Sequence, residues 1–357
     1  MKKRTIVQVV VIAAVVAGLL FSMRGKKPAE LDSGVRMVMG TVARIVVVAP
    51  DEETARASVS AGFAELVEVD ERMSDYKPDS ELSRVNNEAF GREMAVSEEL
   101  FAVLERSVEI SGETDGAFDV TVGPLSAIFR RERETGMAAT EEEIAAAREK
   151  VGYRKLILNR ELRTVRFEVE GMKLDLGAIA KGYGIDKAAE AMRAAGAIGG
   201  MVDVGGDIRC FGKAAGGAGK WRLGVEDPQA AEGEGRYLFV LEFDEGAVAT
   251  SGDYRRFVMI GGERESHIID TSKGRGSKGL RSVTAVADNA MDADGYATAV
   301  TVMGTERGLA YIGSLAGADG LAGVEAVVID EQGAILATAG AKELVRDVKA
   351  GVTVKYR

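Results

Sequence analysis

The spacing of apolar residues predicts a chain that alternates between strands and helices. Dense β-branched and aliphatic runs predict strands at residues 37–49, 199–211, 221–227, 238–243 and 247–250, and the last two are expected to pair with each other. A further short strand is expected within residues 115–125, between turns at Gly and Pro. Helical spacing after three capping residues predicts helices at residues 52–73, 97–111 and 141–151. A further helix is expected at residues 305–315, and a hairpin around residues 330–333.

Short hairpins between the predicted helices favour antiparallel sheets. Residues 156–159 and 164–169 form a predicted hairpin, and Gly205 and Gly206 break the strand at 199–211. The glycine pattern is not the G-x-G-x-x-G of a dinucleotide-binding fold. We therefore expect a mixed α/β fold with helices packed on largely antiparallel sheets.

Residues 173–187 combine the features of an anion-binding site. A short apolar strand carrying Asp175 turns through Gly177 and Ala178 into an Ala-rich helix with Lys181 in its first turn. A helix N-terminus presents unpaired N–H groups and a positive dipole end, which suit a phosphate. The same pattern is typical of an ordinary helix start with a solvated lysine. This stretch alone leaves both interpretations open.

Five further residues carry candidate chemistry. Asp119 lies between apolar residues, so its carboxylate needs either backbone N–H groups or a ligand as its partner. Asp294 and Thr298 lie four residues apart, which on a helix places two oxygen ligands for Mg²⁺ on one face. The alternative is an aspartate that stabilises the helix dipole and a threonine that bonds its own backbone. His267, near Asp270, is either a structural side chain or a functional one.

Composition narrows the classes of function. The formal net charge of the 357 residues is −10, and residues 1–30 hold six Lys or Arg and one Glu, so the remaining chain is more acidic still. An acidic chain of this kind is a poor general nucleic-acid binder. The single cysteine, Cys210, excludes an internal disulfide framework, and the single histidine, His267, excludes a multi-histidine metal site.

The N-terminus predicts a membrane segment. Basic residues 2–4 precede an apolar run at residues 6–23, which as a helix spans about 27 Å, close to the thickness of a bilayer core. We favour an uncleaved anchor over a cleaved signal peptide, because no clean small-residue cleavage site follows the run. Residues 1–30 are thus expected to be an anchor and linker, with an exposed linker at 24–34. Residues 31–357 are expected to form one domain in the periplasm or cell exterior, held at the inner membrane.

Eight short motifs, taken together, resemble the ApbE family of flavin transferases. They occur in the family's order and cover nearly all of residues 35–340. The motifs are Met39-Gly-Thr41, Met73-Ser-Asp-Tyr76, Gly116-Ala-Phe-Asp-Val-Thr-Val-Gly-Pro124, Asp175-Leu-Gly-Ala-Ile-Ala-Lys-Gly182, Gly205-Gly-Asp207, Ser251-Gly-Asp-Tyr254, His267-Ile-Ile-Asp270 and Asp294-Gly-Tyr-Ala-Thr298.

The resemblance implies an ApbE/T-fold-like structure, with two lobes of largely antiparallel sheet and packed helices. It also implies an enzyme that binds FAD in the cleft between the lobes, together with Mg²⁺. It implies transfer of the FMN half to a Thr or Ser hydroxyl of an acceptor protein, as a phosphoester, with release of AMP. Acceptors are expected among subunits of membrane redox complexes of the Rnf and Nqr type, at a Ser/Thr-Gly-Ala-Thr-like site. Two other readings remain open: an FAD pyrophosphatase that gives FMN and AMP, and an FAD-binding protein without turnover.

The resemblance also assigns roles to individual residues. Those expected to contact FAD are Met39, Tyr76, Ala117, Phe118, Asp119, Asp175, Lys181 and Ile269. The expected metal ligands are the Ala178 carbonyl, Asp294 and Thr298, and the candidates for the general base are His267 and Asp270.

Two positions depart from the family pattern. The family usually continues His-x-Ile-Asp with Pro and then a Thr-Gly pair, where this chain has Asp270-Thr-Ser-Lys-Gly274. Gly295 stands where Ala is common. Neither change removes a proposed ligand, but the first alters the loop expected beside the acceptor.

Overall fold

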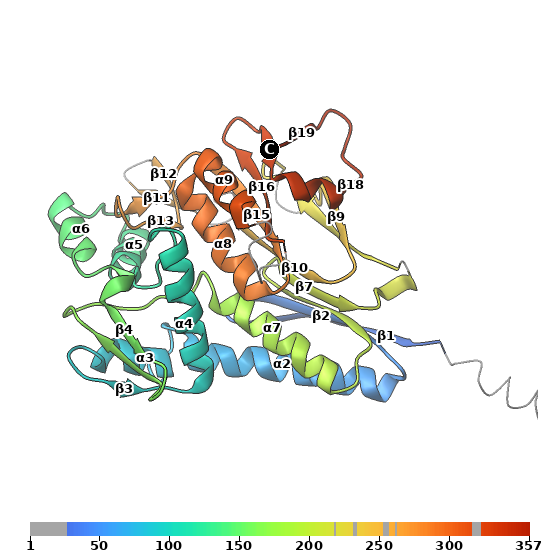
Figure 1. The fold of residues 1–357 in the computed structure, drawn as a ribbon, viewed down its shortest axis with the longest axis horizontal. Helices are drawn as coiled ribbons and strands as arrows, with labels where there is room; N and C mark the ends of the chain where they lie inside the picture. Colours follow the sequence, from blue (N-terminus) through green and yellow to red (C-terminus); the bar gives the residue numbers. More distant parts are fainter. Residues whose placement is uncertain (1–26, 218, 231–233, 253–256, 261–262, 316–322) are drawn as a thin grey trace, which may run out of the picture.

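A nine-stranded sheet, antiparallel except at one edge, forms the largest element of the structure (Figure 1). The structure is a computed structural model that describes residues 27–217, 219–230, 234–252, 257–260, 263–315 and 323–357. Only the outer pair β17–β19 runs parallel. In sheet order the strands are β1 (Ala29–Val38), β2 (Thr41–Ala49), β6 (Gly199–Val204), β7 (Asp207–Gly212), β10 (Gly246–Gly252), β15 (Leu280–Ala287), β16 (Glu325–Asp330), β17 (Ile335–Ala337) and β19 (Val354–Tyr356).

Helices cover one face of this sheet, and a second sheet covers part of the other. The helices on the first face are α2 (Glu52–Met73), α7 (Ala180–Ala194), α8 (Ala290–Met303) and α9 (Thr305–Leu315). The second sheet has the order β18 (Val345–Arg346), β9 (Tyr237–Phe243), β8 (Trp221–Glu226). Successive side chains of a strand point to opposite faces of the sheet, so one strand contributes to both cores. In β16, Val328 packs in the core under the helices, whereas Val327 and Ile329 pack in the core under the second sheet.

A smaller, mainly helical part carries its own three-stranded sheet, at the left of Figure 1. Its strands have the order β3 (Met94–Ala95), β5 (Thr164–Phe167), β4 (Leu156–Asn159). Its helices are α3 (Glu81–Glu88), α4 (Glu98–Glu113), α5 (Gly123–Thr135) and α6 (Glu141–Arg148). Two short hairpins complete the described fold: β11 (Phe257–Ile260) with β12 (Glu263–Ser266), and β13 (Ile269–Asp270) with β14 (Arg275–Gly276).

Local capping chemistry sets most helix starts, as predicted. Asp51 caps α2 by accepting a hydrogen bond from the Thr54 N–H at 2.8 Å. Thr140 and Glu143 form the predicted capping box of α6. The expected helices at residues 52–73, 97–111 and 305–315, the 156–169 hairpin, the Gly205–Gly206 break and the largely antiparallel sheet are all confirmed.

Four strand predictions are wrong. Residues 37–49 form two strands and not one, because Met39 (φ 51°) and Gly40 (φ 67°) adopt the left-handed conformation of a tight turn. The first of these strands, β1, also includes part of the linker predicted at residues 24–34. The segments at 238–243 and 247–250 do not pair with each other, because β9 and β10 lie in different layers. The strand expected within residues 115–125 is absent, since Pro124 lies in the first turn of α5, where its missing N–H costs nothing. Residues 173–175 make only an isolated bridge, from Lys173 to Val122.

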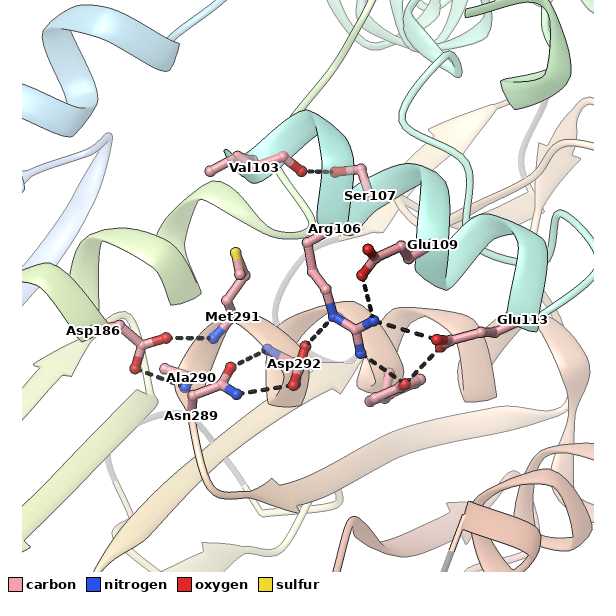
Figure 2. A network of polar contacts seen from close by, with 11 residues as sticks. Val103, Arg106, Ser107, Glu109, Glu113, Asp186, Asn289, Ala290, Met291 and Asp292 are labelled. Carbon is pink, nitrogen blue, oxygen red and sulfur yellow. Dashed lines mark hydrogen bonds and ion pairs between the residues drawn. The ribbon is translucent and has the colours of Figure 1, made fainter. Parts of the chain in front are cut away.

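Polar contacts fix the N-terminal end of α8 to two neighbouring helices (Figure 2). Asp186 of α7 accepts hydrogen bonds from the N–H groups of Ala290 at 2.8 Å and Met291 at 2.9 Å. Arg106 of α4 donates to Asp292 at 2.7 Å. A carboxylate at a helix N-terminus satisfies the orphan N–H groups and the positive dipole end. These contacts tie the first turn of α8, the helix that carries Asp294 and Thr298, to α7 and α4.

The predicted membrane segment at residues 6–23 lies entirely outside the part of the chain that the structure describes. Within the described residues, we find no helix that is both long enough and apolar enough to cross a bilayer. The anchor at residues 1–30 stays a prediction.

Candidate active site

A cavity of about 1420 Å³ opens where the nine-stranded sheet, the β8–β9 layer and the helical part meet. Pockets for drug-sized ligands are typically about 300–1,000 Å³. This cavity therefore accommodates a larger molecule.

The fold brings twelve of the thirteen predicted site residues to this one cavity. They come from segments far apart in the chain. The lining residues are Met39, Tyr76, Ala117, Phe118, Asp119, Asp175, Ala178, Lys181, His267, Ile269, Asp294 and Thr298. Asp270 is the one predicted residue that does not line it.

Three charged side chains meet at the N-terminal end of α7. Lys181, the second residue of the helix, forms an ion pair with Asp207 of β7, and its Nζ lies 3.7 Å from Asp294 Oδ1. Asp207 and Asp294 are only 2% and 4% exposed. With both carboxylates ionised, two negative charges surround one ammonium, and the net negative charge favours an additional cation.

Backbone donors hold both carboxylates of this group. Asp294 Oδ2 accepts from the Gly182 N–H at 3.2 Å, and Asp207 Oδ1 accepts from the Thr250 N–H at 3.1 Å. Burial raises the pKa of Asp294 above its usual value, while the Lys181 ammonium and the Gly182 N–H act in the opposite direction. A bound cation would likewise favour the ionised form.

The oxygen donors fit a hard cation. Thr298 Oγ1 lies one turn beyond Asp294 and 3.3 Å from Ser251 Oγ, and Ala178 lies in the turn before α7. Among the described residues there is no group of three or more His, Cys, Asp or Glu side chains that could hold a metal. One carboxylate, one hydroxyl and one carbonyl suit Mg²⁺, which keeps waters and binds phosphates, better than Zn²⁺.

A second charged group lies at another wall of the cavity, around Arg130 of α5. Arg130 pairs with Asp75, and its guanidinium donates to Asp175 Oδ2 at 3.3 Å. The guanidinium also lies 4.3 Å from the centre of the Tyr76 ring. Tyr76 is 68% exposed, so one edge of this stack remains accessible from the cavity.

Removal of the Arg130 cation should make stability depend on pH. Burial and then the Asp175 charge already raise the pKa of Asp75, against the pull of Arg130. In Arg130→Met this pKa rises further, so the folded state binds a proton that the unfolded state releases above about pH 4. As the pH rises from 5 to 8, the free energy of unfolding of Arg130→Met is therefore expected to fall by about 1–2 kcal/mol more than that of the wild type.

Urea denaturation at several pH values measures this difference. Arg131→Met is the matched control, because Arg131 lies on the same helix but pairs with Glu143 outside the cavity. Parallel pH profiles for Arg130→Met and the control would contradict the coupling between Arg130 and the two aspartates.

Asp119 has backbone partners, one of the two possibilities that its sequence position allowed. Its carboxylate accepts from the Thr121 N–H at 2.8 Å, the Thr121 hydroxyl at 2.6 Å and the Tyr153 N–H at 2.9 Å. Burial raises its pKa, and these hydrogen bonds oppose the rise. Asp119 thus shapes the loop that presents Ala117 and Phe118 to the cavity.

His267 and Asp270 are placed differently, although only three residues separate them. His267 is exposed and lines the cavity. Asp270 is buried, accepts from the Ser272 hydroxyl at 2.5 Å and pairs with Lys273 at 2.8 Å. Burial raises the pKa of Asp270, but Lys273 and Ser272 outweigh it and hold this pKa below its usual range. A carboxylate held ionised by other partners is a weak proton acceptor.

Sequence reasoning missed four residues of the site. Asp207 and Ser251 belong to two of the eight family-like motifs, and this position could have marked them as site residues. Thr250 contributes only its backbone N–H to Asp207. Arg130 had no signal, because α5 itself was not expected.

Comparison with known proteins identifies the family of this chain. The model of the ApbE family matches residues 39–322. The chain belongs to the ApbE family. Among relatives of this ApbE-family chain, the FAD:protein FMN transferase of Vibrio cholerae is 36% identical over 301 residues, covering 82% of this chain and 88% of the relative. The Haemophilus influenzae protein of the same name is 35% identical over 250 residues, covering 68% and 72%.

Solved structures of the ApbE family show the same fold. The ApbE protein of Thermotoga maritima superposes with a TM-score of 0.77 and 29% identity, covering 90% of this chain and all of that one. The flavin transferase ApbE from Vibrio cholerae gives a TM-score of 0.75 and 32% identity, covering 89% and 99%. These matches confirm the mixed α/β fold expected from the sequence.

Proposed function

We propose that this protein transfers the FMN part of FAD to a Ser or Thr hydroxyl of an acceptor protein and releases AMP. The names of its relatives support this activity. The observation that carries the proposal is the buried group of Lys181, Asp207 and Asp294 at a helix N-terminus inside a cavity of about 1420 Å³. A positive dipole end, an ammonium and a cation-binding carboxylate together stabilise the charge of a pyrophosphate.

Each wall of the cavity has a part in binding FAD. The Tyr76 ring and the Met39 side chain offer flat and adaptable apolar contacts to a ring system. Asp175, oriented by the Gly177 N–H at 2.9 Å, can accept hydrogen bonds from ring nitrogens or hydroxyls. Lys181 and the positive dipole end at the start of α7 hold phosphate charge.

Asp294, Thr298 and the Ala178 carbonyl are the residues that would hold Mg²⁺. When bound, Mg²⁺ neutralises charge on the transferring phosphoryl group and the leaving phosphate. The protein's own contribution is to fix these oxygens through α8 and the turn before α7.

The transfer step is an in-line displacement at the FMN phosphorus. The acceptor hydroxyl oxygen forms the new P–O bond, and the P–O bond to the AMP phosphate breaks, so AMP leaves with that bridging oxygen. His267 takes the hydroxyl proton, because it lies at the cavity while Asp270 is held by Lys273 and Ser272.

The same proposal covers location and partners. The apolar run at residues 6–23 supports an inner-membrane anchor with the domain in the periplasm or cell exterior. Membrane redox subunits of the Rnf or Nqr type with a Ser/Thr-Gly-Ala-Thr-like site are then within reach as acceptors. No nucleic acid is expected as a partner, because the chain is acidic.

The test uses the full chain with FAD, Mg²⁺ and an acceptor domain that carries a Ser/Thr-Gly-Ala-Thr site. Intact acceptor mass and AMP are measured together. An FMN-sized mass gain with one AMP per acceptor is expected. Free FMN and AMP without acceptor labelling would instead indicate a pyrophosphatase. Bound FAD without AMP in any mixture would indicate a binding protein and exclude both enzymes.

A further inference from the structure

Three exposed apolar side chains form one patch on the β1–β2 hairpin, which we call the hairpin patch. Val35, Met37 and Val42 are 67%, 73% and 48% exposed. Met37 lies directly opposite Val42 in the ladder, and Val35 precedes Met37 by two residues, so all three point to the same side of the sheet. Adjacent exposed apolar side chains of this kind mark contact surfaces more often than scattered ones do.

The backbone at the hairpin patch also has groups available for pairing. Within the described residues, β1 is the outer strand of its sheet. The two-residue turn at Met39 and Gly40 makes Val38 and Thr41 the closing hydrogen-bonded pair, so the N–H and C=O of Met37 point away from β2. The same holds for Val42, which lies opposite Met37 on β2. Its carbonyl points away from β1 and accepts a hydrogen bond from the Gly205 N–H at 2.8 Å.

The hairpin patch continues into the cavity. Residues 39–42 at the tip of the hairpin all line it, and Val42 belongs both to the patch and to the cavity wall. The opposite side of β1 is covered, because Arg36 packs on the Phe63 ring of α2 at 4.2 Å. An extended chain paired with β1 over the patch would therefore run along the rim of the cavity.

We propose that the hairpin patch and the outer edge of β1 dock the acceptor polypeptide, which adds as an extended strand. This inference rests on the proposed function, since only a protein substrate needs a binding surface at the cavity rim. Main-chain pairing holds a strand of varied sequence, and apolar side chains add affinity. The ion pair of Arg44 with Asp32, with Arg44 Nε 3.0 Å from Asp32 Oδ1, forms a polar margin beside Val35.

The test combines two nearly isosteric changes, Val35→Thr and Met37→Gln, which keep shape and strand preference but remove apolar surface. Neither residue lines the cavity. We expect KM for the acceptor domain to rise about tenfold, with unchanged kcat at saturating acceptor and unchanged Kd for FAD. Met137→Gln is the matched control, because Met137 is 68% exposed but does not line the cavity, and wild-type KM is expected for it.

A second variant tests the main-chain pairing. Met37→Pro removes an outward N–H while an edge strand tolerates the ring, so KM for the acceptor should rise further than in Met37→Gln. A wild-type KM in the double variant, while wild type labels the acceptor, overturns the docking surface and leaves the transferase intact. If the double variant keeps the wild-type KM but no longer binds lipid vesicles, the patch is a lipid-binding surface. If it keeps the wild-type KM but no longer forms a dimer, the patch binds a second copy of the chain. Either result overturns the docking of the acceptor. No labelling by wild type overturns the function and the docking surface together.

Discussion

Asp294→Asn is expected to lower kcat/KM for FMN transfer by about 10³-fold or more while leaving the folded protein at least as stable as wild type. The loss corresponds to about 4 kcal/mol of transition-state stabilisation, a typical value for one electrostatic group at the reacting centre. Stability is retained because Asn keeps an acceptor for the Gly182 N–H at 3.2 Å and removes one of two buried carboxylates around Lys181.

Asp292→Asn is the matched control on the same helix. Asp292 is also buried but accepts from Arg106 at 2.7 Å and does not line the cavity. This variant should lose stability, because it leaves Arg106 with one carboxylate fewer, and should keep most of its activity.

Urea denaturation and transfer kinetics distinguish the two aspartates. In wild type, addition of Mg²⁺ with FAD should raise the melting temperature, and in Asp294→Asn the Mg²⁺-dependent part of that rise should disappear. Full activity in Asp294→Asn would show that Asp294 neither binds the cation nor stabilises charge in the transfer step.

Gly182→Ala is expected to lower the free energy of unfolding by about 3 kcal/mol or more and to reduce transfer activity as well. A Cβ at Gly182 would lie 2.2 Å from the Ala290 carbonyl oxygen and 2.7 Å from the Met291 Cα. Both atoms are backbone at the start of α8, so no side chain can rotate away and the two helices must separate. Activity falls because the Gly182 N–H also donates to Asp294.

Gly313→Ala is the control for helix propensity. Gly313 lies in α9, and nothing lies within 4 Å of its Cβ position, so this change should stabilise the protein by up to about 1 kcal/mol. Thermal unfolding compares the pair. A Gly182→Ala protein as stable as wild type would show that α7 and α8 are not in close contact.

Local patterns in the chain were enough for most helices and for the larger hairpins. Asp51 and Thr140 start their helices as expected, because an N-cap needs only neighbouring residues. The left-handed turn at Met39 was missed, since few residues other than glycine adopt a positive φ and only Gly40 signals it. The assignment of β9 and β10 to different layers was missed for another reason: strands joined by a short connection usually pair.

For the candidate site, the sequence by itself determined which chemical groups are available: one histidine, the Lys181 helix start, and a carboxylate and hydroxyl four residues apart on α8. These follow from residue types and short spacings. Only the tertiary structure decided which groups meet. It set Asp207 against Lys181, placed Arg130 on Tyr76 and kept Asp270 out of the cavity. The physical reason is that these contacts join segments from different layers, and their geometry depends on how whole helices and sheets pack.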